Sequence, residues 1–83
     1  MKKFRFISDP GHGWLEVPLS ELIKSGVQNE VSSYSYYDPK KENVYLEEDC
    51  DAGLFIKAVG LKRDEIEDVY QENTFVRNLP TLK

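Results

Sequence analysis

The chain has 83 residues, with 15 acidic and 11 basic side chains, a net charge of −4 and 12% aromatic residues. This length suits one small domain, and the aromatic content argues against a disordered chain. No run of about 18 apolar residues occurs, which excludes a membrane-spanning helix. The basic start has no apolar segment after it, so we expect no secretory signal, and one cysteine excludes an internal disulfide.

The charge distribution disfavours nucleic-acid binding. The basic residues are scattered in pairs along the chain, whereas a phosphate-binding surface needs them gathered on one face. The acidic residues do cluster, within residues 47–51 and 64–68. Such clusters are either the solvated ends of secondary-structure elements or a surface that steers a basic partner.

The first third of the chain predicts two strands and a short helix. Residues 3–7 and 14–17 predict strands joined by the turn 8–13, which contains one proline and two glycines. Pro18 suits the first position of a helix, because its missing N–H has no partner to lose there. The apolar spacing then predicts a helix over Leu19–Ser25, and Gly26 is typical of the residue that ends it.

The second third repeats this order. Residues 31–37 alternate and predict a strand, residues 38–43 a turn, and residues 44–47 the return strand. A helix is predicted over Asp49–Val59, with Glu48 or Asp49 as its N-cap and Gly60 at its end. Gly53 would cost this helix about 1 kcal/mol relative to alanine, so either a neighbour approaches it closely or the helix begins later.

The last third is less regular, and it completes the prediction of an α+β fold. Residues 66–70 and 74–77 predict strands, although 66–70 also fit one helical turn. We expect a single domain over residues 1–80, with two helices on a mostly antiparallel sheet in the order ββα-ββα plus a C-terminal strand, and a loose tail at 81–83. If residues 14–17 belong to the first helix, the order becomes the split β-α-β-β-α-β. The predicted core is a set of large apolar side chains: Phe4, Phe6, Trp14, Leu22, Ile23, Leu46, Phe55, Ile56 and Val59.

The turn around His12 is the first candidate binding segment. Glycines on both sides of a histidine let the backbone approach a ligand, and such a turn can present N–H groups to an anion. A tight hairpin turn explains the same residues without a ligand. Trp14 is predicted to be a core anchor, with a contact in a partner interface as the alternative.

The acidic stretch 47–51 is the second candidate segment. Its four carboxylates could hold a divalent metal together with His12, or Cys50 could act as a nucleophile with His12 as its base. The usual preference for acids at a helix start, with a buried structural cysteine, explains the same residues. We therefore expect no catalytic residue, no metal site and no cofactor.

Tyrosines at 34, 36, 37 and 45 lie on two runs that we expect to pair, and tyrosine supplies rigid contact area for a partner. The residues expected to contact a partner or ligand come from the turn, the tyrosine run and the acidic stretch: Asp9, Gly11, His12, Gly13, Tyr34, Tyr36, Glu47, Glu48, Asp49 and Asp51. For the turn and the acidic stretch to form one surface, the two halves must pack head to tail or a second chain must supply one half. The tyrosine run is a candidate edge for such a self-contact.

Three sequence motifs, SDPGHGW at 8–14, SYSY at 33–36 and YLEEDCD at 45–51, resemble a group of small uncharacterised proteins encoded by bacteriophages and mobile elements. The resemblance implies a phage accessory protein in the cytoplasm of an infected bacterium, and small proteins of this class often disable a host defence component. We therefore expect a non-enzymatic protein that binds and inhibits a bacterial defence protein, with a homodimer as a further option. One alternative is an oligomeric protein that binds a nucleotide or another anion, and another is a small enzyme that uses Cys50 and His12.

Overall fold

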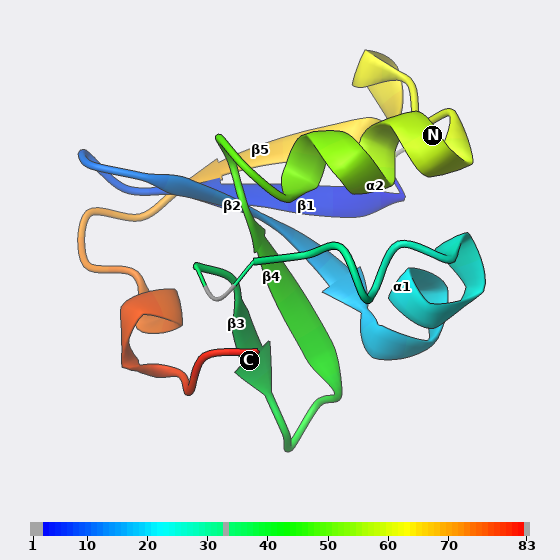
Figure 1. Ribbon diagram of the computed structural model, residues 1–83. Coiled ribbons are helices and arrows are strands. Elements are labelled where there is room, and N and C mark those ends of the chain that lie inside the picture. Colours follow the sequence, from blue (N-terminus) through cyan, green and yellow to red (C-terminus); the bar gives the residue numbers. More distant parts are fainter. Residues whose placement is uncertain (1–2, 33, 83) are drawn as a thin grey trace.

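One five-stranded sheet organises the chain (Figure 1), and the computed structural model describes residues 3–32 and 34–82. The strands lie in the order β3-β4-β2-β1-β5, and all neighbours are antiparallel except β1 and β5. This confirms the predicted α+β class with a mostly antiparallel sheet. No helix within the described residues is long and apolar enough to cross a membrane. The elements in chain order are β1 (Phe4–Ser8), β2 (Gly13–Pro18), α1 (Leu19–Ser25), β3 (Tyr36–Asp38), β4 (Asn43–Glu47), α2 (Ala52–Val59), the 3-10 turn η1 (Arg63–Glu65), β5 (Ile66–Tyr70) and the 3-10 turn η2 (Phe75–Asn78).

The alternation of side chains along the strands divides the core into two clusters. On one face of the sheet, apolar residues of β2 and β4 such as Leu15 and Leu46 pack against Leu22 of α1 and Phe55 of α2. On the other face, the smaller cluster consists of Ile7, Trp14, Tyr45 and Val76. Val76 belongs to η2, so the C-terminal segment covers the face that the two helices leave open (Figure 1).

Helix α1 has the predicted bounds, whereas α2 begins three residues later than predicted. Gly26 ends α1 with φ 85°, and Gly60 ends α2 with φ 66°. The N-cap of α2 is Asp51, not Glu48 or Asp49, and its side chain makes no capping bond. The carboxylate of Glu47 accepts hydrogen bonds from the main-chain N–H groups of Asp49 and Cys50, which makes residues 47–51 a separate turn ahead of the helix.

Replacing Gly53 by alanine is expected to raise the free energy of unfolding by about 0.5–1 kcal/mol. Gly53 is the second residue of α2, and no atom lies within 4 Å of the position that its Cβ would take. Urea denaturation measures the change. The matched control is Gly60→Ala, which forces a side chain into a positive-φ position and should lower stability by about 1 kcal/mol. A loss of stability in Gly53→Ala would contradict the open surroundings described here.

Two of the predicted strands are wrong in extent or type. The tyrosine strand covers only Tyr36–Asp38 instead of 31–37, because Ser32 and Ser35 turn toward the carboxylate of Asp51. Residues 74–77 were expected to be a strand but belong largely to η2, where the Thr74 hydroxyl accepts the Val76 N–H at 3.3 Å. The strand over 66–70 is confirmed as β5.

Two residues of the predicted core lie at the surface. Ile23 is 51% exposed and Val59 43% exposed. The seven-residue helix α1 turns only Leu22 fully inward, and Val59 is the last residue of α2, where the helix leaves the sheet. The other predicted core residues are buried or half-buried.

The expected loose tail is held against the sheet as far as residue 82. Thr81 forms a bridge with Tyr36, and the Leu82 N–H donates to the Ser35 carbonyl at 2.8 Å. The Tyr37 N–H donates to the Pro80 carbonyl at 2.9 Å. These bonds place the segment beside β3, the strand that we expected to be a free edge for self-contact. Residue 83 lies outside the described residues.

Candidate functional site

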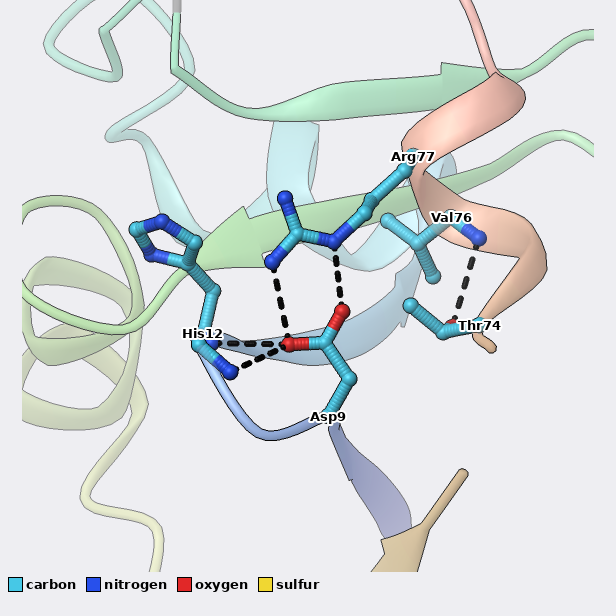
Figure 2. Close-up of polar contacts among 6 residues, drawn as sticks. Asp9, His12, Thr74, Val76 and Arg77 are labelled. Atoms are coloured by element: carbon cyan, nitrogen blue, oxygen red, sulfur yellow. Dashed lines mark hydrogen bonds and ion pairs between the residues drawn. The ribbon is translucent and has the colours of Figure 1, made fainter. Parts of the chain in front are cut away.

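The turn between β1 and β2 is built around the carboxylate of Asp9. Its Oδ1 accepts the main-chain N–H groups of Gly11 at 2.9 Å and His12 at 2.8 Å (Figure 2). The Asp9 N–H in turn donates to the His12 carbonyl at 2.8 Å. An aspartate that bonds to the backbone two and three residues later is a common way to stabilise such a turn. The local sequence therefore fixes the position of His12, whose side chain is exposed.

Arg77, from η2, forms a two-point ion pair with the same carboxylate. Its Nε donates to Oδ2 of Asp9 at 2.5 Å and its Nη2 donates to Oδ1 at 3.0 Å (Figure 2). The Asp9 side chain is only 4% exposed, whereas the Arg77 side chain is 47% exposed. The hydrogen bond from Arg77, with those from the backbone of His12 and Gly11, holds the pKa of Asp9 well below its usual range despite burial. The pair also raises the pKa of Arg77.

The Arg77 guanidinium lies over one of three neighbouring aromatic rings. Its central carbon lies 5.4 Å from the centroid of the Trp14 ring, a distance typical of a cation–π contact. The His12 and Tyr36 rings each lie 6.1 Å from Trp14. We call Asp9, His12, Trp14, Tyr36 and Arg77 the Arg77 cluster. The Nη1 group of Arg77 makes no hydrogen bond to the described residues, and it points away from Asp9 (Figure 2).

The Asp9–Arg77 pair predicts a specific loss of stability in acid. A carboxyl whose folded pKa is lowered stabilises the fold above its ordinary pKa, near 4, and loses that contribution as pH falls through the folded value. Wild type should therefore lose stability on acidification below about pH 4 more steeply than Arg77→Gln, in which the Asp9 pKa returns toward normal. Urea midpoints at a series of pH values measure this, and parallel curves would contradict the role of the pair.

The acidic stretch 47–51 divides into inward and outward side chains. Glu47 accepts two main-chain N–H groups, at 2.7 and 3.1 Å. Asp51 is 1% exposed and accepts the Ser32 N–H at 2.9 Å, the Ser32 hydroxyl at 2.8 Å and the Ser35 hydroxyl. Glu48 and Asp49 are exposed. Two of these carboxylates thus hold the scaffold, and the other two face solvent.

The His12 turn and the acidic stretch meet within one chain. Strand β2 pairs antiparallel with β4, so that Trp14 lies opposite Glu47. The Glu48 N–H then donates to the Gly13 carbonyl at 3.0 Å. The two halves therefore pack head to tail, and this contact needs no second chain. Gly13 itself is buried, and a Cβ there would lie 2.5 Å from the Phe6 ring, so packing requires this glycine.

Cys50 does not occupy the buried position that we expected. Its side chain is exposed. Desolvation and the neighbouring carboxylates of Glu47, Asp51 and Asp49 raise the pKa of the thiol, which works against the thiolate that a nucleophile needs. Among residues 3–32 and 34–82, no group of three or more His, Cys, Asp or Glu side chains is placed to hold a metal ion.

Cys50→Ser is therefore expected to leave the urea midpoint unchanged, because an exposed thiol loses no buried contact when a hydroxyl replaces it. The comparison variant is Leu46→Ala, fully buried in the strand just before, which should cost about 3 kcal/mol. A large loss in Cys50→Ser would show that the thiol packs inside the fold.

The tyrosines take different positions. Tyr34 lies outside the strand and is 67% exposed, whereas Tyr36 is half-buried and pairs with Tyr45 across β3 and β4, as expected. Arg77, which completes the cluster, was not among the predicted contact residues. Its partner Asp9 lies 68 positions earlier, and no local pattern connects the two.

Neither a family model, nor a curated protein, nor a solved structure matches this chain. The likeness to phage accessory proteins therefore stays a prediction, and function must be argued from the site.

Proposed function

We propose that the chain is a non-enzymatic protein-binding protein, and that the Arg77 cluster is the centre of its contact surface. The observation that carries the proposal is the placement of the Arg77 guanidinium. Asp9 fixes it at two points over the Trp14 ring, and the Arg77 side chain is still 47% exposed. An arginine fixed before binding loses less side-chain entropy on association. Arginine and tyrosine are among the residue types most enriched at energetically dominant interface positions, and Trp14, which is 2% exposed, supports the guanidinium from beneath.

The exposed neighbours extend this surface. His12 lies next to Trp14. Glu48, from the acidic stretch, is bonded through its N–H to the Gly13 carbonyl, next to His12 in the chain. Charged groups around a central anchor suit the polar rim of a protein interface. Of the ten expected contact residues, Asp9, Gly13, Glu47 and Asp51 support the surface from within.

The resemblance to bacteriophage proteins supplies the setting of the proposal. In that setting the chain acts in the cytoplasm of an infected bacterium, and its partner is a host protein of bacterial defence. Exposed acidic side chains at Glu48 and Asp49 suit a partner with a basic surface. The bacterial setting and the defence role of the partner rest on the resemblance alone.

Affinity capture from bacterial lysate with immobilised protein tests the proposal. Wild type and Lys24→Ala, an exposed control on α1, should retain one stoichiometric protein. His12→Ala should fold normally, since its ring is exposed, and should bind about tenfold more weakly. Arg77→Lys should also bind weakly, because lysine keeps the charge but not the two-point geometry.

Equal capture by all four proteins would refute the assignment of the surface. Capture of no protein, together with a rise in melting temperature on adding nucleotide, would favour the alternative in which the turn binds an anion. Purified partner and calorimetry then give the affinities of the variants.

A further inference from the structure

Strand β5 forms an edge of the sheet whose outer side no strand of the described residues covers. The bonds at its two ends show which residues face inward. The Lys3 N–H donates to the Glu65 carbonyl at 2.7 Å, and the Gln71 N–H donates to the Ser8 carbonyl at 2.8 Å. Main-chain groups alternate sides along a strand, so the odd-numbered residues face β1. The N–H and carbonyl groups of Asp68 and Tyr70 therefore face outward.

The opposite edge of the sheet shows how this protein covers a strand. There, residues 80–82 bond to the main chain around β3. At β5 the Ile66 N–H is already bonded within the chain, because it donates to the Arg63 carbonyl of η1. The remaining outward groups, from Asp68 onward, form a short ladder to which an extended chain could add.

A cavity beside this edge provides a place for side chains of an added strand. It measures about 220 Å³ and is lined by Phe6, Arg63, Ile66 and Asp68. Phe6 and Ile66 belong to the cluster under the two helices, so the floor of the cavity is apolar. The ion pair between Arg63 and Asp68 lies at its exposed rim. Glu67 points to the opposite face of the sheet, by alternation.

The charge at the edge discriminates between possible occupants. Asp64, Glu67 and Asp68 are exposed along it, and Arg63 already pairs with Asp68. A second copy of β5 would bring the same acids opposite these, and like charges across a strand pair are destabilising. Acidic side chains on an edge therefore prevent self-pairing. The same charges attract a basic strand.

We propose that the outer edge of β5 binds an extended basic segment of a partner protein as a sixth strand. Alternate residues of that segment are apolar and enter the cavity formed by Phe6 and Ile66. The residues between them are lysine or arginine and face Glu67. Main-chain bonds to Asp68 and Tyr70 give this mode its affinity, and side chains on alternate positions give it its specificity. This surface shares no residue with the Arg77 cluster.

The test is a titration of isotope-labelled protein with the capped heptapeptide Lys-Val-Lys-Val-Lys-Val-Lys. We expect a dissociation constant of about 1 mM or tighter, with the largest NMR shifts and slowed deuterium exchange at the amides of Asp68 and Tyr70. A peptide with glutamate for lysine, or with serine for valine, should bind at least about tenfold more weakly. No binding of the lysine–valine peptide, or shifts centred elsewhere, would overturn the proposal.

Two variants separate the main-chain bond from the charge. Asp68→Pro removes the outward N–H at an edge position where proline is tolerated, and should weaken binding about tenfold. Asp68→Asn keeps the N–H and loses one exposed charge with its ion pair to Arg63, so binding should fall only about twofold. Equal affinity for Asp68→Pro and wild type would refute strand addition, and the amide map of wild type decides the matter if Asp68→Pro does not fold. A dimer in sedimentation whose interface is β5 would also refute the proposal, since the occupant of the edge would then be a second copy.

Discussion

Replacing Asp51 by alanine is expected to lower the free energy of unfolding by about 3 kcal/mol. The Asp51 carboxylate is buried and accepts three hydrogen bonds, from the N–H and hydroxyl of Ser32 and from the hydroxyl of Ser35. Alanine would leave these donors without their acceptor, and each buried unsatisfied group costs about 1–3 kcal/mol. Ser35 is itself fully buried, so water cannot replace the lost bond without rearrangement. Urea denaturation at neutral pH measures the change.

Asp49→Ala is the matched control for this experiment. It removes a carboxylate from the same turn, but one whose side chain is exposed, and it should leave the unfolding midpoint unchanged. Equal losses in the two variants would mean that net charge, and not the serine network, determines the effect. Loss of partner binding without loss of stability in Asp51→Ala would restore the contact role that we first expected for this residue.

The elements predicted correctly are those whose signals are local. Helix α1 is bounded by Pro18 and Gly26, which act through their own backbone angles. Strands β1, β2 and β4 follow from alternation, because each has one face against a helix and one against the second cluster. These preferences need no knowledge of distant residues, so a single sequence contains them.

The elements predicted wrongly are those that distant contacts determine. The run 31–37 has strand propensity, but Ser32 and Ser35 bond to Asp51, which lies 16 to 19 positions further on. Residues 74–77 also have strand propensity, but they lie on a face of the sheet, where Val76 packs with Trp14 and Tyr45, and form the 3-10 turn η2. Strand propensity is a weak preference that tertiary packing overrides. No rule applied along the chain could have weighed these competing contacts.

The candidate site was predictable only in part for the same reason. The turn around His12 is a local motif, and its position next to the acidic stretch follows once β2 pairs with β4. The division of the carboxylates was not predictable, because Glu47 and Asp51 differ from Glu48 and Asp49 only in what lies next to them in the fold. Arg77 gave no signal in a stretch that was interpreted as a strand.

Deleting residues 74–83 is expected to unfold the protein. The segment contributes Val76, which is fully buried, and it covers Trp14 and Tyr45 on the sheet face opposite the helices. Burial of each such side chain contributes about 1.5–3 kcal/mol, so the loss approaches the total stability usual for a domain of this size, about 4–12 kcal/mol. Deleting only residues 81–83 should cost about 2 kcal/mol, because it removes the Leu82 hydrogen bond, the Thr81 bridge to Tyr36 and the packing of the half-buried Leu82 side chain. Circular dichroism and proton NMR dispersion measure both effects. A folded 1–73 fragment with wild-type stability would show that the sheet does not need its C-terminal cover, and the contacts of Arg77 would then concern binding alone.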